Sequence, residues 1–186
     1  MKNAFPYCVF VMFAMLLVVT SGSMKAQNPS PSTPVSPQAN PNDVDSIEHL
    51  IAALYDTISG PVGPRNWDRF RSLFDPAARL IPSHRDPSGK IGANSLTVDQ
   101  YAERAKAVFD KEGFYESSLA NRAEVWDHIA HVWSTYESRH VKGEKPFARG
   151  INSFQLLYDG SRWWVVTVYW EGEDSGHPLP EKYLGK

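Results

Sequence analysis

Cysteine is almost absent from this chain of 186 residues, and the single one is Cys8. One cysteine excludes a fold held together by disulfides and a cysteine-rich metal site. A strong net charge of either sign is also lacking. The chain has 19 Lys and Arg residues and 21 Asp and Glu residues, so its formal net charge is −2. Proteins that bind nucleic acids generally are strongly basic, so we expect no nucleic-acid partner.

The motifs of several enzyme classes are missing as well. The chain contains no G-x-S-x-G nucleophile elbow, no G-x-G-x-x-G dinucleotide motif and no phosphate-binding loop, so we expect no cofactor. Asp127, His128 and His131 spell D-H-x-x-H. On a strand, residues three apart point to opposite faces and cannot share one ion, so we predict no metal site.

The first 26 residues follow the order of a secretory signal peptide. Lys2 precedes an apolar stretch over residues 5–19, and a small polar run follows. The uninterrupted apolar part, residues 9–19, is far shorter than the roughly 20 residues that cross a bilayer. We therefore predict export, to the periplasm or outside the cell, with cleavage after Ser23 or Ala26 and no membrane anchor in the mature protein.

The next segment, residues 27–42, carries no charged side chain, and five of its residues are proline. Such a composition cannot bury apolar surface and predicts a disordered linker. Residues 43–186 remain as one domain, which is long enough for a hydrophobic core. Cys8 lies in the predicted signal peptide, so that core has to stabilise the mature fold without disulfides in an oxidising compartment.

The first half of this domain favours helices. Apolar residues recur at spacings of three and four, which indicates amphipathic helices. Asp43 or Asp45 can cap the first helix, and Thr97 with Gln100 forms a capping box for the third. The expected elements are helices over 44–58, 67–74 and 98–109, with one strand over 77–83 and a polar loop over 84–95.

The second half favours strands rich in aromatic residues. The expected strands span 114–125, 129–139, 147–158 and 162–171. Asp159-Gly160 between the last two is a strong hairpin signal. Helices followed by a meander of strands must pack on one face of the sheet, so the fold class is α+β.

The order of these elements and three short motifs resemble the NTF2-like (SnoaL-like) superfamily, in an exported bacterial form. The motifs are Trp67-x-x-Phe70-x-x-Leu73-Phe74-x-Pro76-x-Ala78, Ile129-Ala130-His131-Val132 and Gly150-Ile151-Asn152-Ser153-Phe154. The resemblance covers nearly all of residues 43–172. It implies a cone in which about three N-terminal helices pack on a curved antiparallel sheet and enclose a pocket.

This superfamily includes ketosteroid isomerase, polyketide cyclases, scytalone dehydratase, limonene epoxide hydrolase and domains without catalysis, so the fold does not settle the function. The isomerase mechanism needs a tyrosine, a carboxylate and a protonated acid. By resemblance these positions fall near Leu50, near Pro82 and on Asn152. At two of the three positions the residue present cannot donate or accept the proton that the mechanism moves, which argues against ketosteroid isomerisation.

Strand alternation sorts the second half of the domain into two faces. Matched to the family's last strands, the inner face contains Val132, Ser134, Tyr136, Asn152, Phe154, Leu156, Trp164, Val166, Val168 and Trp170. We expect Tyr136 and Asn152 to orient a ligand's polar group, or to hydrogen-bond neighbouring backbone or each other instead. The predicted ligand-binding residues are Tyr55, Tyr136, Asn152, Phe154, Trp164 and Trp170.

The predicted outer face carries a patch of large side chains, His131, Trp133, Trp163 and Tyr169. Such a patch marks a contact site, and family members commonly dimerise through this face. We therefore expect a homodimer. The alternative is that the long C-terminal tail or side chains of a neighbouring strand cover the patch.

His84 and Asp86 form the most polar cluster near the expected pocket mouth, and a His beside an Asp can act as a general base. A solvated loop is the other interpretation. Three hypotheses for the function follow. The first is an exported domain that binds a small, largely apolar molecule without catalysis. The second is a small lyase, isomerase or hydrolase that uses His84 or Asp86. The third is a dimeric interaction module without a pocket.

Overall fold

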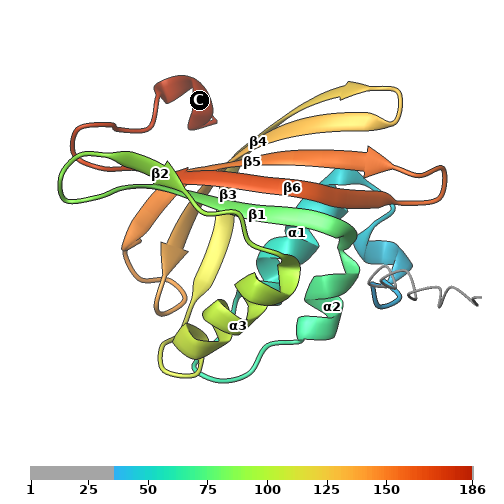
Figure 1. The fold of residues 1–186 in the computed structure, drawn as a ribbon, viewed down its shortest axis with the longest axis horizontal. Helices are drawn as coiled ribbons and strands as arrows, with labels where there is room; N and C mark the ends of the chain where they lie inside the picture. Colours follow the sequence, from blue (N-terminus) through green and yellow to red (C-terminus); the bar gives the residue numbers. More distant parts are fainter. Residues whose placement is uncertain (1–35, 186) are drawn as a thin grey trace, which may run out of the picture. The chain divides into compact units, whose positions relative to one another are not determined.

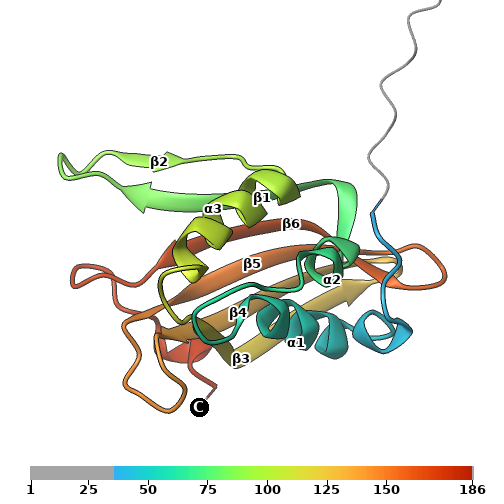
Figure 2. The same ribbon diagram turned by 90° about the horizontal axis from the view of Figure 1, so that it is seen from below.

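The computed structural model describes residues 36–185, so the predicted signal peptide and part of the predicted linker lie outside the described residues. Three α-helices lie on one face of a six-stranded sheet, and the C-terminal segment lies on the other (Figures 1 and 2). The elements are η1 Pro41–Asp43, α1 Ile47–Ile58, α2 Trp67–Ser72, β1 Phe74–Arg85, β2 Ile91–Ala93, α3 Val98–Phe109, β3 Tyr115–Trp126, β4 Ile129–Arg139, β5 Ala148–Tyr158, β6 Trp163–Gly172 and η2 Glu181–Tyr183.

The sheet is mixed, with strand order β2-β1-β6-β5-β4-β3. The α+β class and the packing of the helices on one face are as predicted. The predicted all-antiparallel pairing is wrong at one place, because β1 runs parallel to β6 and Leu80 pairs with Val168. A parallel pair needs a long crossover, and here the crossover consists of the chain from β2 through β5.

Each α-helix begins at a side-chain cap that accepts a backbone N–H. Thr97 and Gln100 form the predicted capping box of α3. For α1 the cap is Ser46, whose Oγ accepts from His49 N at 3.1 Å, and not the expected Asp43 or Asp45. The first helix therefore begins at Ile47, three residues later than its apolar stripe suggests.

Strand β1 is longer than predicted, and the loop that follows it is partly a hairpin. Ser83 pairs with Ala93 and Arg85 with Ile91, which makes β2 an edge strand. The turn closes because one carboxylate oxygen of Asp86 accepts from the backbone of Ser88 at 2.8 Å and of Lys90 at 3.0 Å. A polar, glycine-containing sequence was therefore no obstacle to strand pairing.

The hydrophobic core lies between the helices and the concave face of the sheet. Its fully buried side chains include Leu50, Ile51, Phe70, Leu73, Phe74, Val132, Phe154 and Val165. Burying a side chain of this size stabilises the fold by about 1.5–3 kcal/mol. Within residues 36–185, no helix combines the length and the apolar character needed to cross a membrane.

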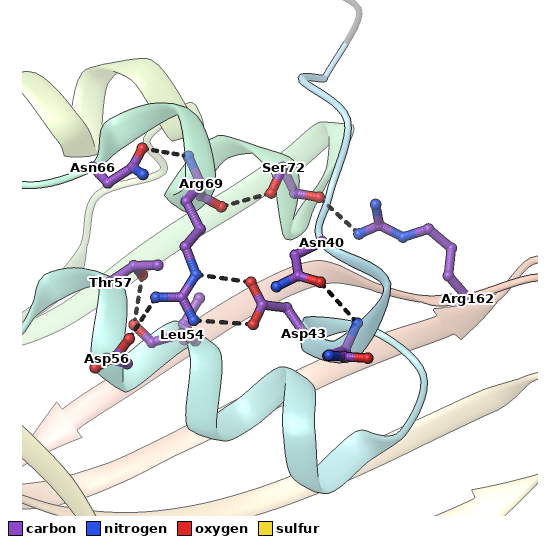
Figure 3. Close-up of polar contacts among 10 residues, drawn as sticks. Asn40, Asp43, Leu54, Asp56, Thr57, Asn66, Arg69, Ser72 and Arg162 are labelled. Atoms are coloured by element: carbon purple, nitrogen blue, oxygen red, sulfur yellow. Dashed lines mark hydrogen bonds and ion pairs between the residues drawn. The ribbon is translucent and has the colours of Figure 1, made fainter.

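An ion-pair cluster fastens the start of the described chain to α1 and α2 (Figure 3). Arg69 donates from Nε and Nη2 to the two carboxylate oxygens of Asp43, at 2.8 and 3.0 Å, and from Nη1 to Asp56. Ser36 Oγ donates to the Phe74 carbonyl at 2.8 Å, and Ala39 packs against the core. The folded part thus begins before residue 43, inside the segment predicted as a linker.

Candidate functional site

A cavity of about 240 Å³ lies between the helices and the concave sheet face. Its wall is mainly aromatic and aliphatic, and its polar side-chain groups are those of Glu116, Ser138 and Asn152 and the hydroxyls of Tyr101 and Tyr136. The lining residues are Leu54, Ile58, Phe70, Phe74, Leu80, Tyr101, Phe114, Glu116, Tyr136, Ser138, Phe147, Ala148, Asn152, Val168 and Trp170. Of the predicted ligand-binding residues, Tyr136, Asn152 and Trp170 line this cavity.

Glu116, near the start of β3, is the only ionisable side chain other than tyrosine in this lining. Ser138 Oγ donates to its Oε2 at 2.8 Å. Its backbone is fixed to the end of α1, because Glu116 N donates to Ser59 Oγ at 2.9 Å and Ser59 Oγ donates to the Glu116 carbonyl at 3.1 Å. The carboxyl group is therefore held in place from two elements.

A β-bulge is what turns Glu116 toward the cavity. Trp126 pairs with Ile129 beside the β3–β4 turn, and an unbroken ladder from there would place Glu116 opposite Arg139. A register shift between Ser118 and Ala120 instead pairs Glu116 with Ser138, on the face that Tyr136 shares. Bulges commonly re-aim a side chain in this way.

Glu116 was not predicted as a site residue from the sequence. The available signal was an acidic residue directly after two aromatic residues, Phe114 and Tyr115. Strand alternation alone does not place this residue in the cavity.

Burial raises the pKa of Glu116 to about 7, and hydrogen bonding from Ser138 and Asn152 offsets only part of that effect. Desolvation disfavours the charged carboxylate, and no cation lines the cavity to compensate it. Near neutral pH the group therefore exists in both protonation states, so it can donate or accept a proton.

Two phenols share the cavity with this carboxyl group. Burial, together with the charge of Glu116, raises the pKa of Tyr101 and of Tyr136 above the usual tyrosine range. Both hydroxyls therefore remain protonated at physiological pH and can donate hydrogen bonds to a bound molecule. Tyr101 comes from α3 and Tyr136 from β4, so the two donors approach the cavity from opposite walls.

Tyr55 lies behind Asn152 and does not line the cavity. Asn152 Nδ2 donates to the Tyr55 hydroxyl at 3.0 Å, and this hydroxyl is 2.6 Å from Ser134 Oγ. Because Tyr55 accepts from Asn152, its own proton is available to Ser134. Tyr55 is thus a positioning residue that fixes the amide of Asn152. The partner of Asn152 is a tyrosine side chain, and not backbone or Tyr136 as the alternative interpretation had it.

The cavity adjoins a more open depression, which we call the vestibule. The two share Tyr101, Phe114, Phe147 and Trp170. The vestibule also contains Arg104, Glu112 and His140, so its charged groups lie outside the cavity proper. His140 stacks on Phe147 with ring centroids 4.1 Å apart. An aromatic pair therefore stands at the boundary between the two spaces.

The predicted faces of Trp163 and Trp164 are reversed in the structure. A bulge between the pairs Gln155–Thr167 and Leu156–Val165 shifts the ladder by one residue. Trp163 consequently packs against the core. Trp164 Nε1 instead donates to Asp159 Oδ2 at 2.6 Å, and the ring does not line the cavity.

Phe154, also predicted to bind a ligand, is fully buried in the core and does not reach the cavity lining.

His84 and Asp86 lie at the β1–β2 hairpin, and neither lines the cavity or the vestibule. His84 is exposed and pairs with Gly92. Hydrogen bonds from Ser88 and Lys90 lower the pKa of Asp86, so its carboxylate is a weak base that stabilises the turn. His84 and Asp86 do not lie at the pocket mouth as expected, because the loop that holds them forms the β1–β2 hairpin.

The C-terminal tail covers part of the outer face. The Tyr183 ring lies 5.7 Å from that of Trp133, and Thr135 Oγ1 donates to the Tyr183 carbonyl at 2.6 Å. His131 Nε2 is 3.0 Å from Ser153 Oγ. Tyr169 keeps 46% of its surface exposed. The alternative of a covering tail therefore holds for Trp133, and the predicted contact face is smaller than the sequence suggested.

The histidines of the D-H-x-x-H segment are separated. His128 Nδ1 lies 3.0 Å from Asp127 Oδ2 in the β3–β4 turn, where Asp127 has a φ of 52°, and His131 contacts Ser153 on the outer face. In the part of the chain that the structure describes, no three His, Cys, Asp or Glu side chains gather closely enough to hold a metal ion.

Comparison with known proteins places this architecture in a recognised fold. Neither protein-family models nor curated proteins give a match. Among solved structures, an NTF2-like protein of unknown function from Pseudomonas putida KT2440 matches 72% of this chain and 90% of its own, with 8% identity and a TM-score of 0.53. A protein of unknown function with a cystatin-like fold from Nostoc punctiforme matches 69% and 90%, with 12% identity and a TM-score of 0.54.

A protein from Novosphingobium aromaticivorans, with a provisional assignment as a scytalone dehydratase, matches 70% of this chain and 83% of its own at 12% identity and a TM-score of 0.52. At such identities a likeness establishes the fold alone. The chain has the NTF2-like α+β fold, as the sequence resemblance predicted.

Proposed function

We propose that this NTF2-like domain binds a small, largely apolar molecule in the cavity beneath its helices. The observation that carries the proposal is an aromatic wall interrupted by one polar cluster, Glu116, Ser138 and Asn152. An apolar pocket with a few convergent polar groups is the usual form of a small-molecule site. The volume of about 240 Å³ suits a compact ligand rather than a drug-sized one.

Native mass spectrometry of the protein from its own host tests this proposal. We expect a retained small molecule, and we expect an Ala148→Phe variant, whose new ring fills the cavity, to lose it. Ala123→Phe is the matched control, because Ala123 is exposed on the edge strand β3. Equal retention by wild type and the Ala148→Phe variant would place the ligand elsewhere and refute the proposal.

A second function, proton transfer by Glu116, is favoured by the carboxyl group at the cavity wall with its pKa of about 7. A base with this pKa can remove a proton next to a carbonyl at neutral pH and return it, and the hydroxyls of Tyr101 and Tyr136 can hydrogen-bond the carbonyl oxygen. Glu116 thereby takes the place of His84 and Asp86 in the enzyme hypothesis. The dehydratase assignment of the Novosphingobium protein is compatible with such chemistry.

Deuterium uptake by phenylacetone in D₂O, followed by NMR, tests proton transfer. The wild-type protein should accelerate exchange above the buffer rate, with a half-maximal rate near pH 7, and Glu116→Gln should abolish the acceleration. His84→Ala is the control and should exchange at the wild-type rate. Acceleration that survives in Glu116→Gln but disappears in His84→Ala would return the role to His84.

Export and dimerisation remain part of the proposal. We propose that residues 1–26 direct export, and cell fractionation with N-terminal sequencing of the mature protein checks it. A homodimer would use the outer-face surface around Tyr169 that the tail leaves open. Sedimentation of the wild type and of Tyr169→Asp tests it, and a wild-type monomer at high concentration would contradict the dimer.

A further inference from the structure

The carboxyl group of Glu116 is an acid without a positive partner. No Lys, Arg or His is among the residues that line the cavity, and within residues 36–185 Glu116 takes part in no ion pair. A carboxylate removed from water is costly unless a cation compensates it. The protein offers Ser138 and Asn152 as hydrogen-bond donors, and neither supplies a charge.

The rest of the wall is suited to a cation. Its aromatic members are Phe70, Phe74, Tyr101, Phe114, Tyr136, Phe147 and Trp170. Aromatic faces carry a negative potential that attracts ammonium groups, most strongly where water is excluded. An anionic ligand would meet these faces and a carboxylate of its own sign, and a neutral ligand would leave the ionised form of Glu116 uncompensated.

We propose that the cavity takes a compact hydrophobic amine, whose ammonium group binds the Glu116 carboxylate among the aromatic rings. This inference rests on the proposed function, because it names the chemical class of the ligand of the same cavity. The ammonium group of the ligand supplies the charge that the cavity wall lacks. Its apolar part fills the space next to Leu54, Ile58 and Val168.

Binding of an amine should depend on pH through Glu116 itself and not through the titratable groups that face it. Tyr55 from α1, Tyr101 from α3 and Tyr136 from β4 all feel its charge and all stay neutral, because burial raises their pKa values. Arg104, Glu112 and His140 lie in the vestibule. Glu116 is therefore the group that changes charge inside the cavity, and an amine that binds below pH 7 should expel its proton.

Isothermal titration calorimetry with 2-phenylethylamine and its neutral analogue 2-phenylethanol tests the inference. At pH 7.5 the amine should bind wild type roughly tenfold or more tightly than the alcohol, which is the effect of one charge-assisted contact. In Glu116→Gln this preference should disappear while the alcohol still binds. Ser161→Ala, in the exposed β5–β6 turn, is the control and should behave as wild type.

A second measurement needs no variant. Titrations at pH 6 in buffers of different ionisation enthalpy should show close to one proton released per amine bound, and none at pH 8.5. Equal affinity for amine and alcohol, or an amine preference that persists in Glu116→Gln, would overturn the inference and leave the binding function standing. Binding of neither probe to wild type would count against the proposed function itself.

Discussion

Tyr136 lies across Gly150, its partner in the β4–β5 ladder, so closely that a Cβ atom at position 150 would be 2.5 Å from the phenolic oxygen. The same atom would also collide with the Glu171 carbonyl oxygen. Glycine at this position is thus what allows the Tyr136 ring to reach the cavity wall. The absence of a side chain at Gly150 thus determines where Tyr136, a proposed ligand contact, lies.

We therefore expect Gly150→Ala to destabilise the domain by about 1–3 kcal/mol, the usual result of overpacking, and to weaken ligand retention. Urea unfolding checks the stability. Gly92→Ala is the control, because its Cβ would meet only the movable His84 ring, at 3.3 Å. An equal loss in both variants would show that the close contact with Tyr136 is not the cause.

Stability should depend on pH through Glu116. Its pKa rises from 4.5 to about 7 on folding, so between these values the folded state holds more protons than the unfolded state. Stability therefore falls as pH rises from about 4.5 to 7, by up to about 3 kcal/mol, and changes no further above that range. Glu116→Gln should be more stable than wild type at pH 8 and similar near pH 4.5, as measured by urea unfolding. A variant advantage that does not change with pH would contradict this assignment.

The bidentate pair of Arg69 and Asp43 should contribute to stability because Asp43 is buried. Asp43→Asn removes the charge and leaves Arg69 with Asp56, and we expect a loss of about 1–3 kcal/mol. Asp68→Asn is the matched control. Its contact with Arg71 is 3.3 Å long and exposed, so its loss should be within about 0.5 kcal/mol. Calorimetric unfolding separates the two, and similar midpoints would refute the prediction.

Removal of the chain after residue 173 should uncover Trp133 and Thr135. Tyr183 contacts both, so truncation should increase quenching of tryptophan fluorescence by acrylamide and promote self-association through the uncovered surface. Analytical ultracentrifugation measures the second effect. Unchanged quenching and an unchanged sedimentation coefficient would mean that the tail does not cover this face in solution.

Much of the fold could be predicted from the sequence because its signals are local. The helix over 98–109 and the strand over 129–139 have the predicted bounds, since a capping box begins the first and a tight turn precedes the second. The parallel β1–β6 pairing could not be predicted locally, because it joins strands far apart in the chain. The resemblance implied a cone but gave its sheet as antiparallel throughout.

The candidate site was predicted only in part, and the misplacement of Trp164 and the omission of Glu116 have one physical cause. Tyr136, Asn152 and Trp170 line the cavity because their strands alternate regularly near them. Beyond a bulge the alternation reverses, which moved Trp164 outward and Glu116 inward. A bulge adds one residue without a distinctive composition, so a pattern with a period of two cannot reveal it.

The parallel pairing of β1 with β6 also governs the order in which the domain can fold. Phe74 lies next to Val165 and Leu80 next to Val168, so β1 finds this neighbour only after the four strands between them have been made. Until β6 docks, the cavity lacks the part of its lining that Val168 and Trp170 provide. Contacts of such long range form late and slowly. A nascent chain with this topology therefore stays open until its last strand has been synthesised and docked.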